Sequence, residues 1–117
     1  MRDSKVKKLP NALARAGITP EFEAACRAQL DRFFAAHPDA TMRKRAMKAL
    51  RILRASEKPL KGKPEGWAAG IIYAVASDGH VLCGVPGSLN AEFEHLMGVT
   101  MGTARYRAAR VMDLLTF

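Results

Sequence analysis

The side chains of this sequence whose types and spacing could do chemistry are mainly basic. From residue 41 to residue 63 there are nine Lys and Arg and one acid, so this segment alone carries a charge of +8. The 117-residue chain as a whole has a net charge of +8 and an isoelectric point near 10.0. Such an excess favours a polyanionic partner, such as nucleic acid or an anionic membrane surface.

Patterns for catalysis or metal binding are weaker. His80 and Cys83 have a spacing that could bind a metal, with His95 or Cys26 as conceivable partners, but a structural zinc site normally shows four ligands in recognisable pairs. We find no nucleophile with a base and an orienting group, and no glycine-rich phosphate loop. We therefore expect no enzymatic activity, no metal site and no cofactor. Cys26 lies on an apolar helix face and is expected to be an inert core thiol.

Two amphipathic helices are predicted in the first half of the chain. Thr19 can cap a helix with Pro20 at its first position, and apolar residues then recur at three- and four-residue steps up to residue 37. A second helix is predicted to begin after Thr41 and to end near residue 56, because Lys58-Pro59 disfavours helical dihedral angles. Its basic residues lie opposite its apolar arc, so it should be apolar inside and basic outside.

A third helix is predicted within "KPEGWAAGIIYAVASDG", with Pro64 at its first position. The apolar run from residue 67 to 76 leaves almost no polar face, which predicts a central helix that is buried on all sides. Gly66 and Gly70 lie one turn apart, although each costs about 1 kcal/mol relative to Ala in a helix interior. We therefore expect a neighbouring helix to cross closely at these glycines.

The end of the chain has the local pattern of a helix-turn-helix. A short helix is predicted up to residue 97, with Ser88 or Asn90 as its cap. Gly98 then supplies a turn, and Thr100 caps the last helix. The inner stripe of that helix is predicted to be Ala104, Ala108, Val111 and Leu115. One position departs from the pattern, because Glu94 stands where such motifs usually place a small alanine.

Two stretches, "KPEGWAAGIIYAVASDG" and "AEFEHLMGVTMGTARYRAARVMDLL", resemble the final three helices of the cyclin-like core repeat in general transcription factor B proteins. The chain is still more similar to an uncharacterised prokaryotic helical domain family. The residues that carry this match are Lys63, Pro64, Glu65, Trp67, Ala68, Ala69, Ile71, Tyr73, Ala74, Gly98, Val99, Thr100, Thr103, Asp113, Leu114 and Leu115. The resemblance implies an all-α, five-helix cyclin-like domain with a C-terminal helix-turn-helix, a fold that contacts promoter DNA in some proteins and docks other proteins elsewhere.

Nucleic-acid binding and protein docking are the two functions left open. For the first, the middle of the outward face of the last helix is Gly102, Tyr106 and Ala109, without the Arg, Asn or Gln that reads bases, so weak sequence preference is expected. For the second, the basic helix would attract a protein partner with an acidic surface. The predicted contacts to duplex DNA or another polyanion are Arg43, Lys44, Lys48, Arg51, Lys61, Lys63, Arg105, Tyr106 and Arg110.

The chain is expected to form one domain over residues 19–117, preceded by a basic N-terminal arm over residues 1–18 with a short helical piece around 11–16. Its opening residues have no apolar run, and no segment approaches the ~18 apolar residues of a membrane span. The two cysteines are far apart and lack a framework pattern, which favours a reducing compartment. The sequence therefore predicts a cytoplasmic protein without a membrane partner.

Overall fold

Five helices make up the part of the chain that the structure, a computed structural model, describes, namely residues 19–56, 61–77, 85 and 87–115. They are α2 (Pro20–Ala36), α3 (Ala40–Arg54), α4 (Pro64–Ser77), α5 (Asn90–Met97) and α6 (Met101–Leu115). No strand occurs among these residues, which confirms the all-α class. The predicted arm over 1–18 and most of the connection over 78–89 lie outside the described residues.

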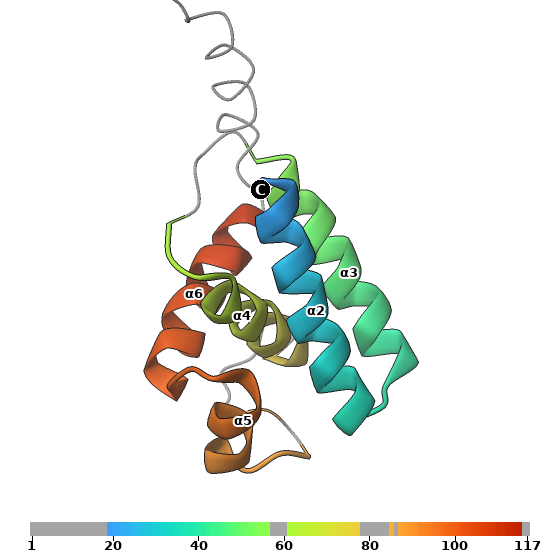
Figure 1. Cartoon of the computed structure of the whole chain (residues 1–117), viewed down its shortest axis with the longest axis vertical. Helices are drawn as coiled ribbons and strands as arrows, with labels where there is room; N and C mark the ends of the chain where they lie inside the picture. Colours follow the sequence, from blue (N-terminus) through green and yellow to red (C-terminus); the bar gives the residue numbers. More distant parts are fainter. Residues whose placement is uncertain (1–18, 57–60, 78–84, 86, 116–117) are drawn as a thin grey trace, which may run out of the picture.

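Helix α4 is the centre of the fold and packs against each of the other four helices. In Figure 1, α2 and α3 run side by side on one side of α4, α6 lies on the other side, and α5 lies below. Every residue of α4 from Gly66 to Val75 is buried. The prediction of a central helix without a polar face is therefore confirmed, since a helix that is enclosed on all sides has no need of one.

The structure agrees with the predicted start of α2 but not with that of α3. Thr19 caps α2 as predicted, with its hydroxyl accepting a hydrogen bond from the Phe22 N–H at 3.1 Å. The predicted start of α3 after Thr41 is wrong, because Asp39 is the cap and its carboxylate accepts from the Met42 N–H at 3.0 Å. The Asp39 carboxylate accepts a hydrogen bond from a first-turn N–H that has no partner within the helix, and its negative charge is favourable at the positive end of the helix dipole. The helix therefore begins two residues earlier than predicted.

The start of α5 also differs from the prediction, since neither Ser88 nor Asn90 is its cap. The helix begins after Leu89, whose N–H donates to the Glu92 carboxylate at 3.2 Å. The Glu92 side chain, at the third position of α5, thus reaches back to the backbone of the residue before the helix, which is one half of a capping box. The cap residue itself therefore needs no polar side chain.

Aromatic side chains join α2 to α5 within the core. Phe33 meets Phe34 and Phe93 edge to face, with ring centroids 4.9 and 5.9 Å apart, and all three rings are buried. Leu30, on the same side of α2, is fully buried. Edge-to-face contacts add about 0.5–1.5 kcal/mol to the burial of the rings. This cluster anchors the short helix α5, which precedes the turn into α6.

Cys26 is fully buried in this core, as expected, and its thiol donates to the Pro64 carbonyl at 3.5 Å. Burial, with smaller effects from the carboxylates of Glu65 and Glu23, raises the pKa of the thiol from 9.0 to about 12. The thiolate fraction at pH 8 should therefore be about 1000-fold lower than for a free thiol.

We predict that alkylation of Cys26 requires unfolding. In a Cys83→Ser variant Cys26 is the only thiol, and iodoacetamide at pH 8 should label the folded protein only at its rate of opening, while denaturant restores the rate of an ordinary thiol. Mass spectrometry over time measures both rates. Rapid labelling of the folded variant would contradict the burial of Cys26.

The raised pKa of Cys26 also predicts a pH dependence of stability. Because the thiol ionises at lower pH in the unfolded chain than in the folded one, the free energy of unfolding should fall as the pH rises from about 9 toward 12.

Candidate nucleic-acid interface

The turn between α5 and α6 is built by two residues, as the sequence predicted. Gly98 has a φ of 73°, in the left-handed region that favours glycine, and its N–H donates to the Glu94 carbonyl at 2.8 Å. Thr100 then caps α6, with its hydroxyl accepting from the Thr103 N–H at 3.1 Å. The short helix, the turn and the long helix are therefore present at the predicted residues.

Glu94 explains why this turn departs from the usual small residue. Its carboxylate accepts a hydrogen bond from the Met101 N–H at 2.7 Å, which is the first amide of α6. The side chain is partly buried and reaches from α5 across the turn. A small alanine at this position could not make the contact, so Glu94 ties the start of α6 to α5.

We predict that Glu94→Ala destabilises the domain by about 1 kcal/mol, because it removes the acceptor for an N-terminal amide of α6. Glu94→Gln keeps an acceptor oxygen and should cost only the charge at the helix N-terminus, roughly 0.5 kcal/mol. Urea denaturation of the two variants and the wild type measures the difference. Equal losses in the two variants would show that the hydrogen bond to Met101 contributes nothing.

Helices α4 and α6 cross closely at Gly70, as the glycine spacing predicted. A Cβ atom added at Gly70 would lie 2.6 Å from the Cβ of Arg107 and 2.9 Å from the backbone nitrogen of Ala108. The predicted inner residues Ala104, Ala108 and Val111 are buried, and Leu115 is partly buried. The small residues on both helices therefore allow their backbones to approach.

Arg107 is the functional candidate that the sequence analysis missed. Its guanidinium carbon lies 4.9 Å from the centre of the Trp67 ring and 5.3 Å from that of Tyr106. The guanidinium rests above Gly62, where an added Cβ would overlap its Nη2 atom, and its stem passes Gly66. No local pattern of the sequence signals this contact, because Gly62 has a φ of 105° that favours glycine by itself and Trp67 lies 40 positions from Arg107.

The residues predicted at the DNA groove lie on the outside of α6. Arg105 and Arg110 are exposed, and Tyr106 is 63% exposed. Arg105 lies on the flank toward α4, where its Nε donates to the Tyr73 hydroxyl at 3.4 Å. Arg110 lies one turn after Arg107 on the other flank. Ala104 and Ala108 are thus inward and Arg105 and Arg110 outward, as predicted, while Arg107 lies between the two faces.

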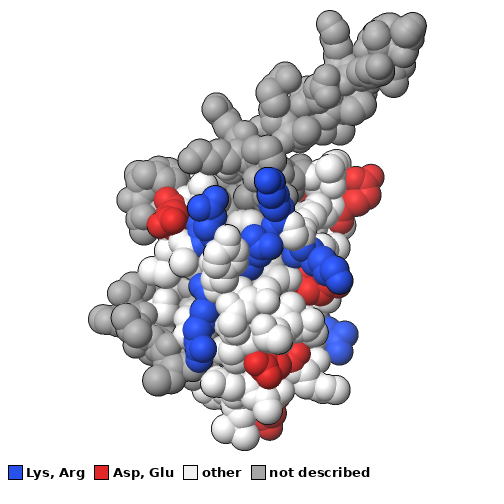
Figure 2. Space-filling model, turned by 90° about the vertical axis from the view of Figure 1, so that its left-hand side faces the viewer, with Lys and Arg blue, Asp and Glu red and all other residues white. Residues whose placement is uncertain are grey.

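The segment over residues 61–63 lies beside this second flank of α6, where Gly62 meets the Arg107 side chain. The Lys61 carbonyl accepts from the Trp67 indole N–H at 2.8 Å, while Lys63 and Arg107 line one hollow. Gly62, between the two lysines, lies against the Arg107 guanidinium, and Arg110 is exposed one turn further along α6. We call the four cations Lys61, Lys63, Arg107 and Arg110 the α6 basic face. Figure 2 shows this side of the molecule, with Lys and Arg gathered in its upper and middle parts and Asp and Glu below and at its margins.

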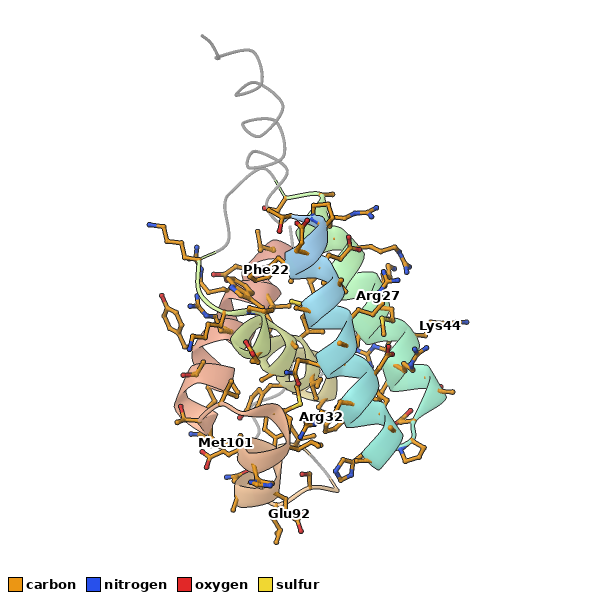
Figure 3. All side chains as sticks on the ribbon, in the orientation of Figure 1. Phe22, Arg27, Arg32, Lys44, Glu92 and Met101 are labelled. Atoms are coloured by element: carbon orange, nitrogen blue, oxygen red, sulfur yellow. The ribbon has the colours of Figure 1, made fainter. Side chains whose placement is uncertain are left out.

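The exposed cations of α3 lie on a different side of the molecule from the α6 basic face. In Figure 3, Lys44 projects from the edge of the molecule opposite Met101, the first residue of α6. Lys48 and Arg51 are exposed at helical spacing from Lys44, so they share its side of α3. The predicted set of phosphate-binding residues is therefore divided between two surfaces, and α3 does not extend the α6 basic face.

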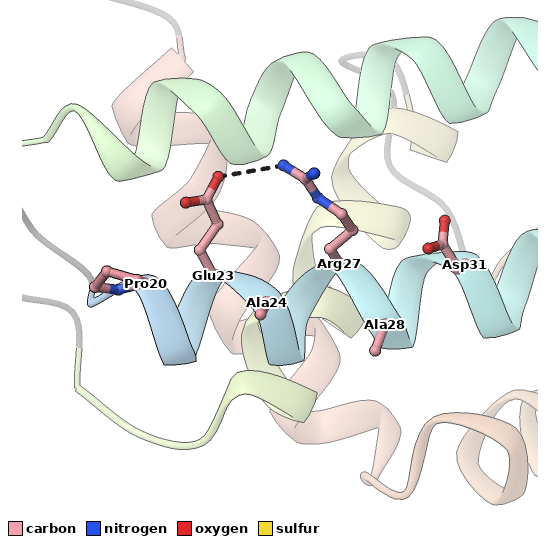
Figure 4. A pocket seen from close by; sticks show the side chains of 6 residues that line it. All are labelled: Pro20, Glu23, Ala24, Arg27, Ala28 and Asp31. Carbon is pink, nitrogen blue, oxygen red and sulfur yellow. Dashed lines mark hydrogen bonds and ion pairs between the residues drawn. The ribbon is translucent and has the colours of Figure 1, made fainter.

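Arg43 is engaged with α2, because its guanidinium forms an ion pair with Asp31 at 2.6 Å. Asp31 also lines a hollow of about 300 Å³ on α2, shown in Figure 4, in which Glu23 pairs with Arg27 at 3.4 Å. Glu23 additionally pairs with Arg54 of α3 at 3.5 Å. These acids compensate the cations near them, so we do not place a polyanion at this hollow.

No group of three or more His, Cys, Asp and Glu side chains that could hold a metal ion lies within the described ranges, and His80 and Cys83 fall outside them. None of the five helices in those ranges is long and apolar enough to cross a bilayer. Searches of protein-family models, of curated proteins and of solved structures found no match for the chain. The resemblance to cyclin-like domains therefore stays a prediction.

Proposed function

We propose that this protein is a non-enzymatic nucleic-acid-binding domain that holds duplex DNA by its phosphates, with weak sequence preference. The observation that carries the proposal is the α6 basic face. Lys63 and Arg107, from two separate segments, line one hollow, and the Arg107 guanidinium lies 5.3 Å from the exposed Tyr106 ring. The exposed Lys61 lies two residues before Lys63, and the exposed Arg110 lies one turn after Arg107. Neutralising phosphates and releasing their counterions supplies most of the affinity of nonspecific DNA binding. Four cations on one side of a small domain suit that mechanism.

These charges are available to a partner. Within the part of the chain that the structure describes, Lys61, Lys63 and Arg110 have no carboxylate within ion-pair distance. The acid in the lining of the hollow is Glu65, which lies there together with Lys63 and Arg107. The α6 basic face therefore keeps a positive charge that can attract phosphates.

In the finer form of the proposal, α5 and α6 act as a helix-turn-helix, with α6 lying along the major groove. Gly102, Tyr106 and Ala109 are exposed along the middle of α6. None of them can form the paired hydrogen bonds by which Arg, Asn or Gln distinguishes a base. Tyr106 would pack against sugar or a base edge, and its role would be to position the helix rather than to read sequence.

A protein-docking function has less support. Such a function calls for a contiguous exposed apolar patch, whereas the exposed large hydrophobic residues in the described ranges are Leu89 and Tyr106. Leu89 precedes α5 and Tyr106 lies in the middle of α6. No observation therefore favours docking over DNA binding.

Fluorescence anisotropy with duplex DNA across a range of salt concentrations tests the proposal. Four phosphate contacts predict a slope of log K against log salt of about −3.6, with binding that is micromolar or weaker. Duplexes of unrelated sequence should bind within about threefold of one another, because the phosphate term is independent of sequence. The proposal fails if no binding is seen at low ionic strength. A partner that survives nuclease treatment in a pull-down would instead support docking.

A further inference from the structure

A hollow of about 490 Å³ lies between the 61–63 segment, the first turn of α4 and the start of α6. Its lining includes two cations, Lys63 and Arg107, and two hydroxyl groups, those of Thr100 and Thr103. The Thr100 hydroxyl is engaged as the cap of α6 and lies 3.2 Å from that of Thr103. Lys63 before α4, and Thr100, Thr103 and Arg107 at the start of α6, thus place cations and hydroxyl groups around one space.

Arg107 is held in place at this hollow by the residues beneath it. Its guanidinium lies over the Trp67 ring, and its Nε would be 3.4 Å from a Cβ at Gly62 and 3.8 Å from one at Gly66. A side chain at Gly62 would overlap the guanidinium, whereas one at Gly66 would only be in ordinary van der Waals contact with the Arg107 side chain. Because the arginine is already fixed, it loses less conformational freedom when it binds a ligand than an exposed lysine would.

Among the described residues, no hydrogen bond or ion pair engages the guanidinium of Arg107. Its Nε is buried and has no partner within that part of the chain, and its guanidinium carbon lies over the rings of Trp67 and Tyr106. The oxygen atoms of a phosphate are the acceptors that best match the N–H groups of arginine. A phosphate in the hollow would therefore provide hydrogen-bond acceptors for the guanidinium, which the described residues around Arg107 do not provide.

We propose that this hollow is a binding site for a phosphate group, which Lys63 and the Nη groups of Arg107 hold by charge and the Thr103 hydroxyl by a hydrogen bond. This inference rests on the proposed function, since it identifies the point at which one phosphate of the DNA backbone is seated. Glu65 lines the same hollow, so one of the two positive charges is offset. The affinity for a single phosphate group is therefore weak.

Titration of the full chain with inorganic phosphate, at constant ionic strength against chloride, measures this site. Amide chemical shifts of Gly62 and Gly66 should change with a saturable, millimolar curve. Lys63→Gln should weaken the binding roughly fivefold, because one charged contact is lost. Glu65→Gln should strengthen it, because a like charge is removed from the hollow. Lys48→Gln, the same substitution on α3, should leave the curve unchanged.

The source of the phosphate is decided by competition. If duplex DNA displaces inorganic phosphate at the same ionic strength, the site binds a phosphate of the DNA backbone. If phosphate saturates the hollow and DNA leaves it occupied, the site is confirmed and its ligand is free phosphate or a small phosphate ester.

Shifts at Gly62 that grow linearly without saturation, and equally in Lys63→Gln, would overturn the proposal. DNA binding through Lys61 and Arg110 would then still stand or fall by its own salt titration.

Discussion

Replacing Gly70 with alanine is expected to destabilise the domain by about 2 kcal/mol. The added methyl group would lie 2.9 Å from the backbone nitrogen of Ala108 and from the backbone carbon of Arg107. Backbone atoms cannot rotate away, so α4 and α6 must separate, and overpacking of this kind costs about 3 kcal/mol. The gain in helix propensity from Gly to Ala offsets about 1 kcal/mol of this loss. Urea denaturation followed by circular dichroism measures the change.

Gly66→Ala is the matched control, one turn earlier in the same helix. The nearest atom to its added methyl group is Cγ2 of Thr103, at 3.3 Å, and the next atoms belong to the Arg107 side chain at 3.8 Å. Side chains can adjust, so the free energy of unfolding should change by less than about 1 kcal/mol. If Gly70→Ala were as stable as the wild type, the close crossing of α4 and α6 would be wrong.

Neutralising two cations of the α6 basic face should weaken DNA binding strongly. We expect the double variant Lys61→Gln, Arg110→Gln to lower the salt slope by about 2 and the affinity by about 60-fold in 0.1 M salt, since each phosphate contact is worth about 0.9 decade there. Both residues are exposed, so the fold should be retained, and both lie outside the lining of the phosphate hollow. Fluorescence anisotropy against salt measures the slope and the affinity.

The matched control removes the same charge from α3. Lys44→Gln, Lys48→Gln should weaken binding by no more than about threefold, because these residues lie on the far side of the molecule and salt screens their charge over that distance. Equal losses in the two double variants would mean that net charge alone governs binding. Such a result would remove the reason for assigning DNA to the α6 basic face.

The sequence by itself was enough to predict the helices and several contacts within them. The Thr19 cap, the left-handed turn at Gly98 and the Thr100 cap all act within one helical turn, so the residue types nearby decide them. The close crossing at Gly70 was also predictable, because a glycine in a buried helix is costly unless another helix needs its space. The start of α3 was missed because Thr41 and Asp39 are both acceptable caps, and only the structure shows that Asp39 acts.

Only the tertiary structure decided which charged residues share a surface. Helical periodicity fixes the direction of Lys44 around the axis of α3, but not the direction in which that side of α3 faces once it has packed on α4. The packing of all helices around α4 places Lys61 and Lys63 beside α6 and turns the cations of α3 elsewhere. The contact of Arg107 with Trp67 joins residues 40 positions apart in the chain, so no local pattern of the sequence could specify it.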